Sequence, residues 1–305
     1  MISAKTQRLK AYRFRLDLTD EQRGLCERTS GHCRFVWNLF RSQREAWYEC
    51  VSDIPSHLRD RSVSPNNQIS QGNQLPPLKK QFPFLKEAPS HCLQQVLIDL
   101  DQAYRNFFEK RASYPQAKRK DRGQDSFRFP DPKQIERRNN ELKLPKLGWV
   151  KLRNSYRRIR GNLRNVTVSR RGVHWYASVL YAREVPVAYH PSISVVGLDR
   201  NCGDNLCALS TGEIIEGVTP LKDALKRLAK LQRRLSRKKK GSANFKKMRT
   251  KIARLYERIV NIRSDLLHKL THRLSKNHAM VVVESLQVVT MTASASEPPM
   301  SPDEW

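Results

Sequence analysis

The stretch ISVVGLD, residues 193–199, is an apolar run typical of a buried strand, and it ends in a carboxylate. A second stretch, MVVVE at residues 280–284, has the same pattern and the same ending. A carboxylate at the edge of a buried strand is unfavourable unless it is hydrogen-bonded, paired or bound to a metal. Strands joined by a crossover can lie side by side, which would let Asp199 and Glu284 converge on Mg²⁺. The alternative is two unrelated acids at strand ends.

The segment between these two strands is expected to be largely helical. Short strands at 206–209 and 213–215, with a turn at 211–212, lead into two predicted helices at 220–240 and 244–277. Leucine and isoleucine recur at helical spacing in both, so the helices can pack as an antiparallel hairpin turned at 241–244.

The same segment carries an unusual excess of positive charge. Between Lys222 and Arg254 there are fifteen Lys or Arg residues and one acid, Asp223. A solvated coiled-coil surface is the alternative interpretation, but such surfaces normally mix both signs, so the excess favours phosphate binding. The residues expected to bind nucleic acid are Arg233, Arg234, Arg237, Lys238, Lys239, Lys240, Lys246 and Lys247.

The composition of the whole chain points to the same class of partner. Its 305 residues include 58 Lys and Arg against 29 Asp and Glu, a formal net charge of +29. Such a charge predicts a polyanionic partner held by salt-sensitive phosphate contacts, and a ribosomal-type protein that only coats RNA is an alternative. The apolar runs are far shorter than the ~20 residues that span a bilayer, so we expect no membrane partner and a cytoplasmic, nucleoid-associated location.

The six cysteines are scattered along the chain and form no C-x-x-C pair. That spacing lacks the pattern of a zinc site, so no zinc is expected. Reduced and mostly buried thiols are the expectation for such a protein.

The first half of the chain is expected to begin with a strand at 10–18. Thr19 and Gln22 form a predicted capping box, followed by a helix to about residue 49 with a break near Gly31. Residues 51–83 are expected to be a surface loop, and Ser90 to cap an amphipathic helix over 90–108. Strand-like runs at 126–129, 141–144, 149–152, 163–170 and 174–182 then predict an antiparallel sheet or barrel.

Several of these segments together carry a resemblance to a known family. They are YRFRL (12–16), GHCRFVWN (31–38), LQQVLIDLDQAYRNFF (93–108), LKLPKLGWVKLR (142–153), VVGLDRN (195–201), RRLSRKKKGS (233–242) and VVVESL (281–286). In this order the chain resembles TnpB, the RNA-guided nuclease family of insertion sequences and a relative of type V CRISPR effectors. The resemblance covers about residues 8–295.

The resemblance implies an α+β multidomain fold. An oligonucleotide-binding-type β-barrel, the wedge, would comprise 1–16 and 119–190, with a helical recognition lobe inserted at 17–118. A truncated RNase H-like (RuvC) α/β domain with the basic helical hairpin would follow at 191–292, and a divergent tail at 293–305. The implied partners are a guide RNA and a double-stranded DNA target with a short adjacent motif.

The resemblance also implies roles for individual residues. Asp199 and Glu284 match the carboxylates that bind the catalytic Mg²⁺. Ser90, His91 and Gln94 match a region that reads the target-adjacent motif. The family's third catalytic Asp and zinc ribbon lie beyond the position of Ala295, where this sequence diverges.

We therefore expect an RNA-guided DNA-binding protein that is cleavage-defective and represses transcription at its target, with Mg²⁺ bound weakly. The alternatives are an active Mg²⁺-dependent RNA-guided DNA endonuclease, a decayed transposon remnant with residual RNA binding, and an RNA-binding chaperone-like protein.

Overall fold

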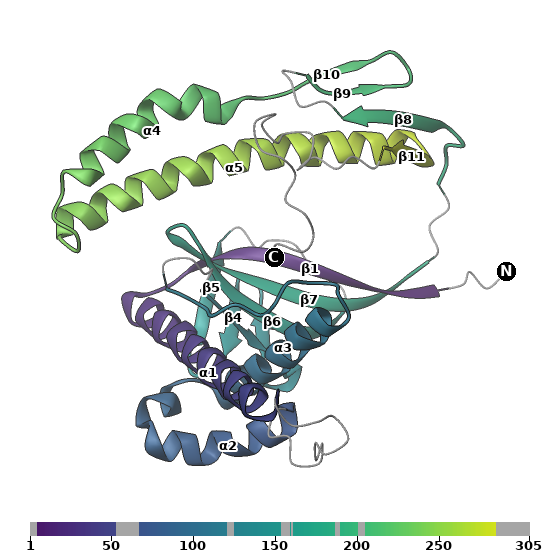
Figure 1. Cartoon of the computed structure of the whole chain (residues 1–305). Helices are drawn as coiled ribbons and strands as arrows, with labels where there is room; N and C mark the ends of the chain where they lie inside the picture. Colours follow the sequence, from purple (N-terminus) through teal and green to yellow (C-terminus); the bar gives the residue numbers. More distant parts are fainter. Residues whose placement is uncertain are drawn as a thin grey trace. The chain divides into compact units, whose positions relative to one another are not determined.

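The computed structural model describes residues 5–52, 67–120, 125–153, 159, 161–186, 190–200 and 205–284. The chain divides into two compact units, residues 1–187 and 188–305 (Figure 1). Both helices and sheets are present in each unit, so the predicted α+β class is confirmed. Within the described ranges, no helix is long and apolar enough to cross a membrane.

The first unit contains a curved antiparallel sheet of seven strands. They are β1 (Lys5–Asp17), β2 (Ser126–Phe129), β3 (Glu136–Arg138), β4 (Glu141–Leu144), β5 (Gly148–Arg153), β6 (Asn162–Arg171) and β7 (His174–Pro186). Their order is β2-β6-β7-β1-β5-β4-β3. The long strand β1 pairs with β7 from Lys5↔Pro186 to Arg15↔Tyr176 and with β5 near its end, so the first strand joins the two halves of the sheet.

Within the described residues, this unit also has three α-helices: α1 (Asp20–Ser52), α2 (Gln68–Gln81) and α3 (Ser90–Phe108). Short 3₁₀ helices, η2 (Pro83–Glu87) and η3 (Pro132–Gln134), lie in the connections. The predicted capping box is confirmed. The Thr19 backbone N–H donates to Gln22 Oε1, and the Gln22 N–H donates to Thr19 Oγ1, both at 3.2 Å.

Two predictions for these helices are wrong. Helix α1 runs through Gly31 without a break, because buried side chains on both sides of it hold the helix against α3. The expected loop at 51–83 contains α2, although 53–66 lie outside the described residues. Asn67 caps α2 by accepting the N–H of Ser70, and the helix continues through Pro76 and Pro77 with Gln71 and Leu75 buried.

A third difference concerns the start of α3. Pro89 occupies the N-cap position and Ser90 is the first helical residue, so Ser90 does not cap the helix. The predicted apolar face is present, with Leu93, Val96, Leu97, Leu100 and Tyr104 buried.

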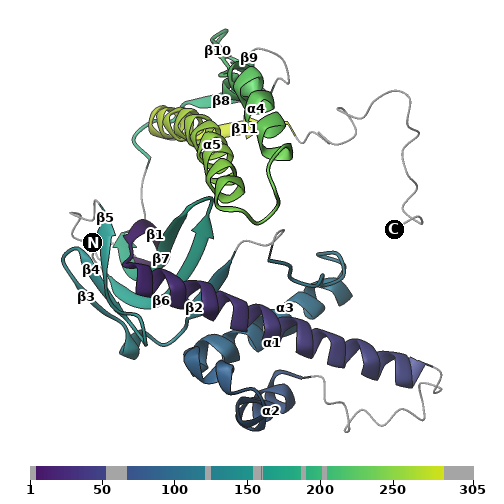
Figure 2. The ribbon, with the colours of Figure 1, turned by 90° about the vertical axis from the view of Figure 1, so that its left-hand side faces the viewer.

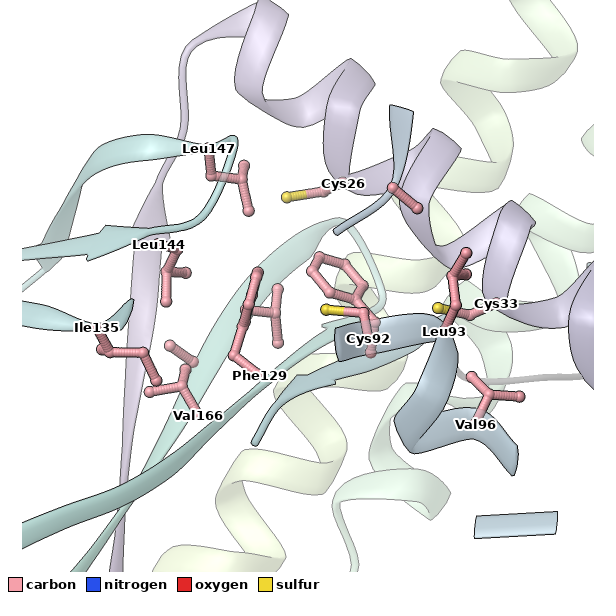
Figure 3. Close-up of a cluster of buried hydrophobic side chains, with 14 of the residues drawn as sticks. Cys26, Cys33, Cys92, Leu93, Val96, Phe129, Ile135, Leu144, Leu147 and Val166 are labelled. Carbon is pink, nitrogen blue, oxygen red and sulfur yellow. The ribbon is translucent and has the colours of Figure 1, made fainter. Parts of the chain in front are cut away.

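The helices and the sheet of the first unit share one hydrophobic core. Figure 3 shows Cys26 and Cys33 from α1 meeting Cys92 and Leu93 from α3, beside Phe129 and Val166 from the sheet. Burial raises the pKa of the Cys26 and Cys33 thiols to about 12. Cys207 is also buried and Cys50 is exposed, whereas Cys202 lies outside the described residues.

The second unit has a four-stranded sheet and a helical hairpin. The strands are β8 (Val195–Arg200), β9 (Asn205–Leu209), β10 (Ile214–Glu216) and β11 (Met280–Val283), in the order β10-β9-β8-β11. Gly212 makes the predicted turn between β9 and β10 at φ +84°, a conformation that suits glycine. Leu270 and Leu274 pack against Val196, Cys207 and Leu209 on one face of the sheet.

The hairpin consists of α4 (Pro220–Ser236) and α5 (Ala243–Asn277), which lie side by side in Figures 1 and 2. Leu228 and Ile259 are buried between them, as the predicted seam requires, although Leu225 stays half exposed. Helix α4 ends four residues earlier than predicted, because residues 237–242 form the turn, with Gly241 at φ +88°. Ser242 then caps α5 by accepting the N–H of Phe245 at 3.1 Å.

Candidate nucleic-acid interface and carboxylate pair

The carboxylates Asp199 and Glu284 lie at the ends of two neighbouring parallel strands. The pairing of β8 with β11 runs from Val195↔Met280 to Leu198↔Val283. The next residue on each chain is the acid, so the sheet places both acids at the same edge. The prediction that these two strands lie side by side is therefore confirmed.

Both acids also point to the same face of this sheet, and that face is open. Side chains alternate along a strand, so Asp199 shares its face with Val195, and Glu284 shares it with Val282. Val195 is 57% exposed and Val282 is 53% exposed, and both acids are exposed. The expectation of fully buried strands is wrong here, since only the α5 side is covered. The desolvation argument for a metal consequently does not apply to these carboxylates.

A residue that the sequence did not single out connects the two strand ends. The Arg200 guanidinium donates from Nη2 to the backbone carbonyl of Glu284 at 2.9 Å. This contact fixes the end of β11 against β8, directly beside both acids. No sequence pattern could have identified it, because it joins two segments 84 residues apart.

The chemistry of this pair fits Mg²⁺. Magnesium prefers oxygen ligands, and it commonly binds through one or two carboxylates while keeping several waters. Asp199 and Glu284 would hold such an ion, which would supply Lewis-acid assistance at a phosphate. Among the residues that the structure describes, no group of three or more His, Cys, Asp or Glu side chains is placed to hold a metal.

The basic residues predicted to bind nucleic acid surround the turn of the hairpin. Arg233 and Arg234 lie in the last turn of α4, where the negative end of the helix dipole stabilises cations. The run 237–240 forms the turn itself, and Lys246 and Lys247 follow in the first turns of α5. All eight side chains are exposed: Arg233, Arg234, Arg237, Lys238, Lys239, Lys240, Lys246 and Lys247.

This arrangement is suited to anions for a second reason. The first turn of α5 carries backbone N–H groups without partners inside the helix, and these attract phosphate oxygens. The hairpin tip therefore combines eight exposed cations with a helix N-terminus. Such a surface can bind the backbone of a nucleic acid without reading its sequence.

The three predicted motif-reading residues lie on the first turns of α3. Ser90 and Gln94 are exposed, and His91 is half-buried. The Ser90 hydroxyl accepts a hydrogen bond from Lys79 Nζ at 2.7 Å, and His91 Nδ1 lies 3.9 Å from Asp131 Oδ2. All three lie at the start of one helix, and their role in reading a motif stays a prediction.

Two lysines at this helix end were not identified from the sequence. Lys79 comes from α2, and Lys146 reaches the carbonyls of Lys86 and Ala88 just before α3. Burial, together with the nearby Lys146, lowers the pKa of Lys79. Lys79 lies beside the Ser90 hydroxyl and Lys146 beside the Ala88 carbonyl, which suits a contact with phosphates.

Comparison with known proteins settles the family. The chain is 41% identical over 291 residues to the "Putative RNA-guided DNA endonuclease InsQ" of Escherichia coli (strain K12), covering 95% of this chain and 69% of that protein. A model described as a probable transposase matches residues 178–295. The chain belongs to the TnpB family.

Two further proteins are similar to this chain over most of its length. A "Putative RNA-guided DNA endonuclease" of Streptomyces pristinaespiralis is 36% identical over 285 residues, covering 92% of this chain and 67% of that protein. A chain in the cryo-EM structure of a Cas12f1–sgRNA–target DNA complex aligns with a TM-score of 0.49 at 9% identity, covering 92% of this chain and 81% of that one.

A helix-turn-helix domain model also matches this TnpB chain, over residues 6–52. In the structure these residues are most of β1 and all of α1. One strand and one uninterrupted helix occupy the segment, so it does not form a helix-turn-helix.

Proposed function

We propose that this chain is an RNA-guided DNA-binding protein. The exposed basic tip of the α4–α5 hairpin carries the proposal, because its eight cations suit an extended phosphate backbone. Family membership supports a guide RNA and a DNA target as the partners, since the relatives are named as RNA-guided DNA endonucleases.

The proposal extends to the parts of the fold. The curved seven-stranded sheet would be the oligonucleotide-binding-type wedge, with α1, α2 and α3 as the recognition lobe. The sheet of the second unit would be the RNase H-like part. Ser90, His91 and Gln94, supported by Lys79 and Lys146, would read the short motif beside the target.

We further propose that the 305-residue chain binds its target without cutting it and thereby represses transcription there. Asp199 and Glu284 supply two carboxylates on an exposed face, where solvent competes for any bound ion. Phosphodiester hydrolysis requires ions held in fixed positions at the attacking and leaving oxygens. Two exposed ligands are a weak support for such positions.

A second candidate function is a Mg²⁺-dependent endonuclease. The adjacency of Asp199 and Glu284 on parallel strands favours it, since this geometry is suited to a shared ion. The two candidates differ in one observable, which is metal-dependent cleavage of a matched DNA.

The RNA that copurifies with the protein tests the proposal. One dominant structured RNA is expected, and its binding should weaken about 10³-fold or more between ~50 and ~200 mM salt if at least six phosphates are contacted. A broad sample of cellular RNAs would instead indicate an RNA-binding protein without a defined guide. An RNA affinity that changes little with salt would contradict binding through the phosphate backbone.

A further inference from the structure

An open aromatic cavity lies at the far ends of α1 and α3, away from Ser90 and Gln94. Its volume is about 400 Å³, within the range of about 300–1,000 Å³ typical of small-ligand sites. Six aromatic side chains line it: Trp47, Tyr48, Tyr104, Phe107, Phe108 and Tyr114. No role in the proposed function accounts for this cluster.

The aromatic rings of the cavity wall pack against one another. Tyr114 meets Tyr104 edge-on at 5.7 Å between ring centroids and meets Phe107 at 5.2 Å. The hydroxyl groups of Tyr104 and Tyr114 lie 3.2 Å apart and form a hydrogen bond. The wall is therefore a preformed aromatic surface with a polar edge.

A buried arginine fixes the floor of the cavity. Arg44 stacks its guanidinium over the Tyr104 ring at 5.1 Å. It is held there by Gln71 at 2.9 Å and by Asp101 at 3.3 Å. Because the guanidinium is anchored on the protein side, the ring of Tyr104 keeps a fixed orientation.

Two of the aromatic rings are left largely in solvent. Tyr48 is 60% exposed and Phe108 is 68% exposed. Large aromatic side chains contribute most to folding when they are buried, so packing alone does not explain two exposed rings beside one cavity. Clustered exposed apolar groups at a hollow are typical of binding sites.

The charge around the cavity indicates the class of ligand. The stretch 110–120 begins two residues after Phe108 and contributes Tyr114 to the wall. It contains five Lys or Arg: Lys110, Arg111, Lys118, Arg119 and Lys120. Of these, Arg111 is paired with Glu109, which directly follows Phe108, and Lys118 lies over the Trp37 ring at 3.7 Å. Glu45, an acid of the helix that contributes Trp47 and Tyr48, is paired with Arg41 at 2.5 Å.

We propose that this cavity binds an unpaired nucleobase of single-stranded nucleic acid. Exposed rings next to a basic segment are the combination by which proteins hold single strands, with bases stacked on the rings and phosphates on the cations. A base within a duplex is already stacked and could not enter. The inference rests on the proposed nucleic-acid function and adds a binding site to it. The strand could be the guide RNA or a separated DNA strand.

The double variant Tyr48→Ala/Phe108→Ala tests the site, because both side chains are exposed and their loss should leave the core intact. Fluorescence anisotropy would measure binding to short oligouridine RNA, to the matching deoxyuridine DNA, and to that DNA with abasic sugars. The matched control is Leu9→Ala/Ile69→Ala, which removes two exposed apolar side chains elsewhere on the same unit.

We expect the double variant to lose roughly 5- to 100-fold in affinity for the base-containing strands, the range for losing one base–aromatic stack. On the abasic strand it should bind as the unmodified protein does. The ring-preserving variant Tyr48→Phe/Phe108→Tyr should retain affinity. A loss confined to the RNA arm assigns the base to the guide, and a loss confined to the DNA arm assigns it to the target.

Equal affinity of the double variant and the unmodified protein on all strands would overturn the site. An equal loss on the abasic strand would also overturn it, since the effect would then not depend on a base. If the unmodified protein bound none of these short single strands, this site would be overturned, whereas the proposed function would still be decided by the copurified RNA. Loss of binding only in hairpin variants would overturn the cavity alone.

Discussion

Asp199 and Glu284 each stand one residue beyond the last paired residues of adjacent parallel strands, Leu198 and Val283. The sheet register therefore places two acids that are distant in the sequence at one edge. Arg200 holds the two strand ends together by donating a hydrogen bond to the Glu284 carbonyl. The geometry is suited to an ion, and the exposure of both acids limits how firmly an ion would be held.

The variant Asp199→Ala separates binding from cutting. Affinity for a matched DNA should be unchanged, because guide pairing and backbone contacts carry recognition. With Mg²⁺ or Mn²⁺ present, we expect no cleavage by the unmodified chain on a sequencing gel. Metal-dependent cleavage that disappears in both Asp199→Ala and Glu284→Ala would make the chain an endonuclease.

Charge reversal at the hairpin tip tests the nucleic-acid interface. Changing Arg233, Arg234, Arg237 and Lys238 to Glu should abolish most RNA affinity, since attraction to phosphates becomes repulsion. Circular dichroism should barely change, because all four side chains are exposed and the seam lies elsewhere.

A pair of matched variants controls for net charge in that experiment. Arg237→Glu/Lys238→Glu and Lys269→Glu/Lys276→Glu remove the same charge from the same hairpin, but the second pair lies on the far half of α5. Only the Arg237→Glu/Lys238→Glu variant should weaken RNA binding strongly. Equal losses would show that net charge, and not the hairpin tip, determines affinity.

The strand segments were predictable from the sequence because their alternation is local. Ser126–Phe129 and Glu141–Leu144 have the predicted bounds, and the capping box at Thr19 forms as expected. The adjacency of Asp199 and Glu284 followed from two apolar runs with a crossover between them.

Features that depend on tertiary packing were not predictable in this way. Pro76 and Pro77 oppose a helix locally, yet α2 forms because its own side chains Gln71 and Leu75 are buried against the rest of the unit. The open face of β8 and β11 depends on which side α5 covers, and Lys79 and Lys146 come together only in the fold. Distant pairings of this kind leave no periodic signal.

An ion-pair cluster around the buried Asp125 should contribute to the stability of the first unit. Asp125 is 8% exposed, accepts a hydrogen bond from Arg34 at 2.6 Å and forms an ion pair with Arg170 at 2.9 Å. Asp125→Ala should lower the free energy of unfolding by about 1.5–3 kcal/mol, because the partly exposed Arg34 and Arg170 lose a charged partner. Urea denaturation would measure the loss.

The exposed pair of Asp20 with Arg23 provides the control. Asp20→Ala should leave the urea midpoint almost unchanged, since exposed pairs contribute little. Similar midpoints for Asp125→Ala and Asp20→Ala would contradict the assigned role of the buried cluster.

His32 should make stability depend on pH. Burial lowers its pKa below the ordinary value of 6.5, with Glu87 opposing the shift, and its ring packs against Phe84 at 5.3 Å. Folding therefore favours the neutral ring, so its contribution is present above pH 6.5 and is lost as the pH falls through the lowered pKa. The difference between the urea midpoints at about pH 8 and about pH 5 should be smaller in His32→Phe than in the unmodified protein. An unchanged difference between those midpoints would assign the pH dependence to other groups.

Selection of DNA by the RNA-loaded protein tests the central claim most directly. The library would carry sites matching the unstructured end of the copurified RNA, with randomised flanking sequence, beside scrambled sites with the same flanks. We predict strong retention of the matching sites, with one short flanking motif enriched, and little retention of the scrambled sites. Equal retention of matching and scrambled sites would contradict RNA-guided binding and leave a protein that binds nucleic acid through charge alone.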